Sequence, residues 1–371
     1  MGRRVRRGAG FQPAGADTAG WKPAPRRTRR PGRAQDPLPA GKKRITLDHD
    51  LRSTHWSQDG KTVVTQSTRK AVGDARPDIN FKTVEVWDAR TGKQLQSLGE
   101  IENPGFPFHY VSADGARLVI SQQFRLRTGE MEVWDVARIT KTRTVAVPLR
   151  PRPIHCIVLA PKGDRVVDIF ESGGFTEEAG PGRGGYDVFD TATGQLVKTL
   201  REESAIPRTA VFTPDSGSLV TRGSNDAIRL WDVASGKVVR EAQASKDSGY
   251  QLALSPDGKT LVIPTARRVP LQVWSVPDLK DRGTIPNPFT TVMQVTFSPA
   301  GKRLLVAGYR DALDPNADTP PRSGVMVWDL ERKVTLHDWE TTSLRCGFCG
   351  EDEVGIGAGS EITVYPIGRG P

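Results

Sequence analysis

The chain has 371 residues, a formal net charge of +10 and 3 Cys. Three cysteines are too few for a disulfide framework in a chain of this length, and no apolar run reaches the 18 or more residues of a membrane span. The N-terminus lacks the apolar core of a signal peptide. These features exclude a disulfide-rich secreted domain and a helical membrane protein, and we expect a cytoplasmic protein.

The positive charge lies in the first part of the chain. Residues 1–44 carry 13 Lys/Arg and 2 Asp/Glu, which leaves 40 basic and 41 acidic residues in 45–371. Residues 1–42 are rich in Arg, Pro and Gly without hydrophobic periodicity, so we expect a disordered basic tail. Such a tail is either a solvated extension or an electrostatic arm for nucleic acid, acidic lipid or an acidic protein. Residues 45–371 are nearly neutral, so we expect no nucleic-acid binding except through this tail. Even there, only Phe11 and Trp21 could stack on bases.

From residue 43 onward, short alternating segments predict β-strands. The clearest group comprises AVFT (210–213), SLVTRG (218–223), AIRLWDV (227–233) and KVVREA (237–242), which turn residues separate. Four short antiparallel strands of this kind form one blade of a β-propeller.

The same unit recurs seven times. An aromatic residue, usually followed by Asp, ends the third strand of each unit: Trp87-Asp88, Trp134-Asp135, Phe189-Asp190, Trp231-Asp232, Trp274-Ser275, Trp328-Asp329 and Tyr365-Pro366. A turn after the first strand forms a second series, as in Ser57-Gln58-Asp59-Gly60 and Ser255-Pro256-Asp257-Gly258. The aromatic residues are spaced 47, 55, 42, 43, 54 and 37 residues apart, and the turn series keeps in step with them. Short strands that repeat at about 40–45 residues indicate a propeller. We expect the aromatic series to pack between blades rather than to bind a ligand.

The segment Ser224–Arg240, SNDAIRLWDVASGKVVR, resembles the WD40-repeat β-propeller family, as in a bacterial WD40-like repeat protein. The Gly-His pair that commonly opens such a repeat is missing. The predicted fold is all-β, a seven-bladed β-propeller of four-stranded antiparallel blades over residues 43–371. Arg44–Asp48 is expected to complete the last blade and so to close the ring. The resemblance implies a non-catalytic scaffold that binds a protein or peptide partner. We expect a monomer without cofactor or metal.

The predicted binding face is the one that carries the long connections between second and third strands, here called B–C loops. They are 67–81, 124–129, 171–185, 266–270 and 309–324, and insertions gathered on one face of a repeat protein favour binding there. Neutral insertion into exposed loops is the alternative. The candidate partner-binding residues are Arg69, Lys70, Arg76, Arg125, Arg127, Arg183, Arg267, Arg268, Arg310 and Arg322. Acidic residues lie among them, which suits a protein partner of mixed charge. Trp56 and Trp339 fall outside the aromatic series and are weaker surface candidates.

Two further patterns bear on catalysis or metal binding. His55, His109 and His155 lie at or near equivalent positions of first strands, so a channel metal or base is the alternative to a structural role. A propeller hydrolase or lactonase, or a ligand site in the channel, is therefore the second hypothesis. Cys346-Gly347-Phe348-Cys349 has the spacing of half a zinc knuckle, but the alternation of Leu344, Cys346 and Phe348 favours a packed strand.

Overall fold

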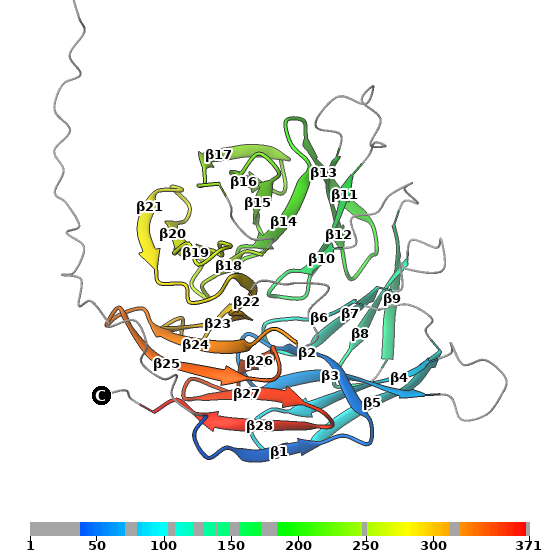
Figure 1. Cartoon of the computed structure of the whole chain (residues 1–371). Coiled ribbons are helices and arrows are strands. Elements are labelled where there is room, and N and C mark those ends of the chain that lie inside the picture. Colours follow the sequence, from blue (N-terminus) through cyan, green and yellow to red (C-terminus); the bar gives the residue numbers. More distant parts are fainter. Residues whose placement is uncertain are drawn as a thin grey trace, which may run out of the picture. The chain divides into compact units, whose positions relative to one another are not determined.

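The alternating segments form 28 β-strands in seven four-stranded antiparallel sheets (Figure 1). This holds for the residues that the computed structural model describes, which are 38–70, 80–102, 108–121, 130–138, 140–147, 156–171, 184–246, 251–311 and 320–368. The predicted all-β, seven-bladed fold is confirmed. The predicted tail lies almost wholly outside the described residues.

Each blade uses four strands in the order A to D. Blade 1 contains β2 (Asp50–Trp56), β3 (Thr62–Lys70), β4 (Asn80–Asp88) and β5 (Gln94–Glu102). Blade 2 contains β6 (Phe108–Val111), β7 (Arg117–Ser121), β8 (Glu130–Asp135) and β9 (Thr140–Ala146). Blade 3 contains β10 (Cys156–Leu159), β11 (Arg165–Glu171), β12 (Gly184–Asp190) and β13 (Leu196–Glu202). Blade 4 contains β14 (Pro207–Phe212), β15 (Ser218–Gly223), β16 (Ala227–Asp232) and β17 (Lys237–Gln243).

The remaining three blades follow the same scheme. Blade 5 contains β18 (Ala253–Leu254), β19 (Thr260–Ile263), β20 (Leu271–Ser275) and β21 (Asp281–Ile285). Blade 6 contains β22 (Thr291–Phe297), β23 (Arg303–Tyr309), β24 (Ser323–Asp329) and β25 (Val334–Thr341). Blade 7 contains β26 (Arg345–Phe348), β27 (Glu353–Ala358), β28 (Glu361–Pro366) and, as its outer strand, β1 (Lys42–Thr46).

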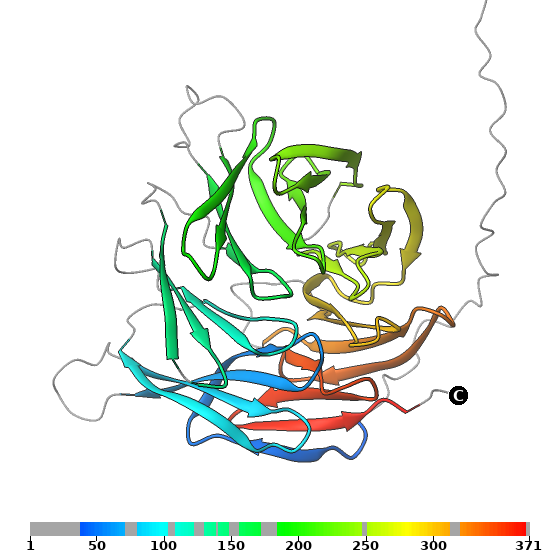
Figure 2. The same ribbon diagram turned by 180° about the vertical axis from the view of Figure 1, so that it is seen from behind.

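The A strands follow one another around a common centre. Contacts run from β2 through β6, β10, β14 and β18 to β22, and β26 contacts β2. Figures 1 and 2 show the seven sheets set around this centre from opposite sides. Antiparallel meanders of this order place the A–B and C–D turns on one face, and the B–C and D–A connections on the other. These are called the turn face and the loop face below.

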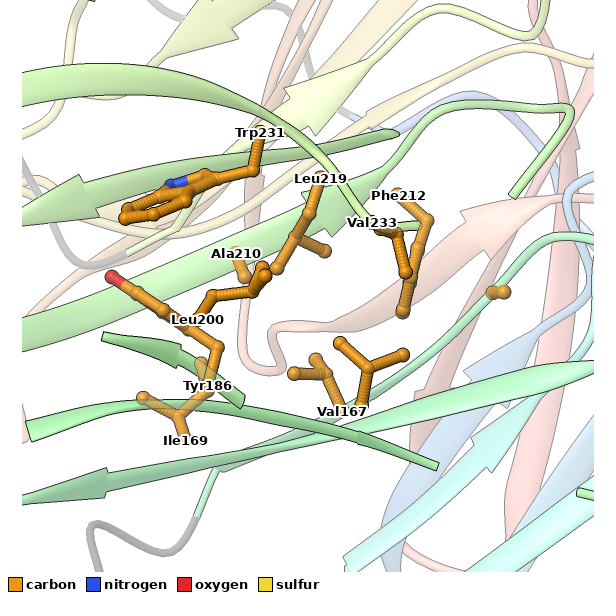
Figure 3. Close-up of a cluster of buried hydrophobic side chains, with 11 residues drawn as sticks. Val167, Ile169, Tyr186, Leu200, Ala210, Phe212, Leu219, Trp231 and Val233 are labelled. Atoms are coloured by element: carbon orange, nitrogen blue, oxygen red, sulfur yellow. The ribbon is translucent and has the colours of Figure 1, made fainter. Parts of the chain in front are cut away.

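The aromatic residue of each C strand packs against the preceding blade. Trp231 of blade 4 is 5% exposed and belongs to a cluster with Val167, Ile169, Tyr186 and Leu200 of blade 3 (Figure 3). The equivalent residues belong to such clusters in every blade: Trp87, Trp134, Phe189, Trp274, Trp328 and Tyr365. The predicted packing role of this series is confirmed.

The polar residues of the repeat hold the turns. Asp88 accepts hydrogen bonds from the backbone N–H groups of Arg90 (3.0 Å) and Thr91 (2.7 Å), which fixes the C–D turn of blade 1. In the A–B turn, Ser57 Oγ donates to Asp59 at 2.6 Å, and the same pair of residues recurs as Ser112 and Asp114 (2.6 Å). Short side chains that bond their own backbone in this way stabilise tight turns.

The A–B turns also connect one blade to the next. The Asp59 N–H donates to the carbonyl of Ala113 at 2.9 Å, and the Ala113 N–H donates to the carbonyl of Pro161 at 2.8 Å. Gly60 has a φ of 68°, and a β-carbon there would lie 2.4 Å from the backbone nitrogen of Gly350 in blade 7. Glycine is therefore required both for the left-handed turn and for the close approach of the two blades.

Candidate functional site

The B–C loop of blade 5 is the part of the predicted binding face that the structure describes most fully. Arg267 and Arg268 have φ values of 56° and 62°, which non-glycine residues rarely adopt. Backbone hydrogen bonds hold this conformation, because Arg267 N–H donates to Thr290 (2.7 Å) and Arg268 N–H donates to Phe289 (2.9 Å). Both arginine side chains are exposed, and the adjacent Val269 is 38% exposed. The loop thus presents cationic and apolar groups on a fixed backbone.

This loop is continuous with the start and end of the blade 6 B–C loop. Arg268 Nη2 donates to the carbonyl of Arg310 at 2.8 Å, and the Arg310 N–H donates to the carbonyl of Arg322 at 2.7 Å. The exposed Arg322 guanidinium bonds both oxygens of Asp311, at 2.9 and 3.0 Å. These hydrogen bonds lower the pKa of Asp311 and raise that of Arg322.

Arg310 differs from its predicted role on the exposed rim. It is 4% exposed, bonds Asp338 and the carbonyl of Trp339, and stacks over the Phe289 ring at 4.9 Å. Trp339 is also not a surface residue, because it is 1% exposed and stacks on His337 at 4.6 Å. A charged or aromatic residue beside a loop can face the core, and the sequence pattern alone does not distinguish the two cases.

The other candidates lie at or beyond the edge of the described residues. Arg69 and Lys70 end β3 on the loop face. Arg76, Arg125, Arg127 and Arg183 lie outside the described residues. Of the ten predicted residues, the structure therefore brings together Arg267, Arg268, Arg310 and Arg322.

The starts of the A strands add residues that the sequence analysis missed. Register shifts place Arg52 in blade 1 and Met293 in blade 6 at bulges, and both side chains are exposed. Arg345 of blade 7 donates from Nε to the carbonyl of Arg52 at 2.8 Å. The pKa of Arg345 is lowered, mainly by burial and also by the positive charge of Arg52. These strands line the centre of the ring, so the three residues flank the channel on the loop face. The sequence spacing could have identified two of them as equivalent positions, because Arg52 and Met293 each lie five residues before the serine of the A–B turn.

The three candidate histidines do not share one register position. His55 pairs with Val64, whereas His109 pairs with Ile120, and comparison of the two ladders shows that Tyr110 is the equivalent of His55. His155 lies outside the described residues. A one-residue shift reverses the face of a strand, so the repeat does not place these histidines in one ring.

His55 should make the protein less stable in acid. Burial lowers its pKa from 6.5 to about 4, so between these values the unfolded chain binds a proton that the folded chain does not. The contribution of the neutral His55 to the free energy of unfolding is therefore present above pH 6.5 and lost as the pH falls toward 4. Between pH 7.0 and pH 4.5, the free energy of unfolding measured in urea should fall by about 2 kcal/mol less in His55→Gln than in the wild type. An identical pH dependence in the two proteins would show that His55 does not stay neutral in the folded chain.

The cysteine motif is part of the core. Cys346 and Cys349 are free and 0% and 3% exposed, and burial raises the pKa of each thiol to about 12. The prediction that Cys346 packs within a strand is confirmed. Among the described residues, no three His, Cys, Asp or Glu side chains gather to hold a metal ion. Within the same residues, no helix has the length and apolar character needed to cross a membrane.

Comparison with known proteins adds distant relatives. No family model matches the chain. It is 28% identical over 204 residues to pre-mRNA-processing factor 17 of Homo sapiens, an alignment that covers 46% of this chain and 34% of that protein. It is 25% identical over 186 residues to periodic tryptophan protein 2 of Arabidopsis thaliana, covering 49% and 18%. It is 30% identical over 129 residues to WD repeat and SOCS box-containing protein 1 of Danio rerio, covering 34% and 27%.

These alignments span only 18% to 34% of the relatives' length. Together with the seven blades, relatives that include a WD-repeat protein confirm the resemblance to the WD40-repeat family.

Proposed function

We propose that this WD40-like propeller is a non-catalytic scaffold that binds a protein or peptide partner on its loop face. The observation that carries the proposal is the blade 5 loop, where two consecutive arginines are held in a rare backbone conformation with their side chains exposed. Backbone strain that surrounding hydrogen bonds maintain is a feature of binding sites. The similarity to a WD-repeat protein supports a propeller that takes part in protein interactions.

Charge and hydrophobicity indicate the chemistry of the partner. Arg267, Arg268 and Arg322 are exposed at the rim, and Arg52 flanks the channel. Val269 and Met293 expose 38% and 44% of their surface on the same face. Arginine and methionine are enriched in protein interfaces. We therefore propose a partner segment with acidic residues beside apolar ones, and a monomeric propeller in the cytoplasm, where free buried thiols such as Cys346 are common.

A double variant on the loop face tests the proposal. Arg267→Glu with Val269→Ser should lower recovery of the partner about tenfold or more in affinity capture from source-cell lysate, because reversed charge and lost apolar contact both weaken binding. The matched control is Arg240→Glu with Val239→Ser, since both residues are exposed on the outer strand β17. Equal losses in the two variants, at unchanged melting temperature, would refute a loop-face site.

A further inference from the structure

A cavity of about 310 Å3 lies among the A strands of four blades. It is lined by Thr54, His55, Trp56, Ser57 and Gln58 of blade 1, Tyr110 and Val111 of blade 2, Gln294, Val295, Thr296 and Phe297 of blade 6, and Gly347 and Phe348 of blade 7. These residues include the start of the blade 1 A–B turn, so the cavity extends toward the turn face. It is distinct from the loop-face site proposed above.

Hydrogen bonds between blades brace the walls of this cavity. Gln58 Nε2 donates to the carbonyl of Phe297 at 3.1 Å, which joins blade 1 to blade 6. Gln294 Nε2 donates to the carbonyl of Cys346 at 2.8 Å, which joins blade 6 to blade 7. The shape of the cavity is therefore fixed by the ring itself, as in most small-molecule sites, which are largely formed in advance.

Trp56 forms an aromatic wall of the cavity. Its indole packs on blade 7, where a β-carbon on Gly347 would lie 2.2 Å from the ring and one on Gly355 would lie 2.3 Å from it. Two adjacent strands of blade 7 thus lack side chains where the indole lies. An aromatic ring held in this way offers an apolar surface in a fixed position.

The polar groups of the lining carry no net charge. Among the described residues that line the cavity there is no Lys, Arg, Asp or Glu, and burial keeps His55 neutral at pH 7. A charged ligand would lose its hydration there without an opposite charge in return. The lining therefore selects for an uncharged molecule.

Two lining residues have hydrogen-bonding atoms that the protein does not satisfy. Thr54 Oγ1 and Trp56 Nε1 are buried and have no hydrogen-bond partner in the structure. A buried polar group without a partner costs free energy, so an occupant with hydrogen-bonding groups is favoured at this position. The cavity volume corresponds to that of about ten water molecules. It lies at the lower end of the range of ligand-pocket volumes, which begins at about 300 Å3.

We propose that this cavity binds a small, neutral, polyhydroxylated molecule of the size of a monosaccharide. The ring of a monosaccharide presents C–H groups on one face and hydroxyl groups around its edge. The C–H groups match the apolar surface of Trp56, and the hydroxyl groups can bond Thr54 Oγ1 and Trp56 Nε1. The binding is reversible and involves no chemical step.

Saturation-transfer NMR and calorimetry on the full chain test this proposal. The probes are glucose, galactose, mannose and N-acetylglucosamine, with glucosamine and glucuronate as charged counterparts. At least one neutral sugar should bind saturably, and about tenfold more tightly than the charged sugars, because an unpaired charge is poorly tolerated in the cavity.

Variants locate the binding. Thr54→Val removes one hydrogen-bonding group while keeping the shape, and Trp56→Phe removes the indole N–H together with part of the aromatic surface, so each should weaken binding about fivefold or more. The control Thr284→Val changes an exposed threonine of β21 and should have no effect. Absence of saturable binding by every neutral sugar would show that the cavity holds water only. Equal binding of charged sugars, or unchanged affinity in both cavity variants, would also overturn the proposal.

Discussion

Removal of residues 1–48 should lower the free energy of unfolding by about 4–8 kcal/mol, whereas removal of residues 1–37 should leave it unchanged. β1 pairs with β28 from Lys42 to Thr46 as the outer strand of blade 7. Ile45 and Leu47 are 2% and 4% exposed and belong to the cluster that contains Trp87. Burial of two such side chains contributes about 1.5–3 kcal/mol each, and the strand ladder adds to this value.

Urea unfolding and thermal melting of the two truncated chains measure this effect. A point variant separates packing from chain length, since Ile45→Ala should cost about 2–5 kcal/mol and the control Ile45→Val about 0.5–1.5 kcal/mol. If the two truncated chains melt at the same temperature, β1 does not stabilise the ring.

Replacement of Arg229 by Met should cost about 3–5 kcal/mol, because it leaves the Glu202 carboxylate buried without a cation. Glu202 of blade 3 is 2% exposed, and Arg229 of blade 4 bonds it through Nη1. Arg229 also bonds Glu241 from Nε at 2.9 Å and Ser204 from Nη2 at 2.8 Å. The guanidinium therefore joins two blades through several charge-assisted hydrogen bonds.

A double variant distinguishes charge from packing in this pair. Arg229→Met with Glu202→Gln removes both charges and should recover most of the loss, because no unpaired charge stays buried. The control Lys141→Met breaks the exposed pair with Glu132 on the surface of blade 2 and should cost at most about 1 kcal/mol. Similar losses in the single and double variants would show that the pair acts through packing alone.

The fold could be predicted because its cause is local and repeated. Each blade needs the same tight turns and the same large aromatic residue against its neighbour, so pairs such as Ser57 with Asp59 and Trp231 with Asp232 recur along the chain. A repeat of this kind reveals number and order of strands without any knowledge of contacts between distant residues. The outer strand of blade 7 could also be assigned, because Arg44-Ile45-Thr46-Leu47-Asp48 resembles the outer strand of blade 6, Lys333-Val334-Thr335-Leu336-His337.

The candidate site could be predicted only in part, because the pairing between strands decides whether a given side chain points to the core or to solvent. Arg310 looked like an exposed loop residue, yet Asp338 and the Phe289 ring hold it in the core. His55 and His109 differ by one register position, because His55 lies two residues before Ser57 of its A–B turn and His109 lies three residues before Ser112. The cavity escaped prediction altogether, since it brings together Thr54, Gln294 and Gly347 from three blades.

The pairing of β1 with β28 has a consequence for synthesis of the protein. Ile45 pairs with Ile362, so β1 leaves the ribosome long before its partner strand β28. At about 5–20 residues per second, the first strand waits roughly 16–60 s for the second. During that interval the six preceding blades can form in order, but the seventh sheet cannot. The nascent chain thus carries an unpaired strand, open to pairing with other strands, until β28 has been made.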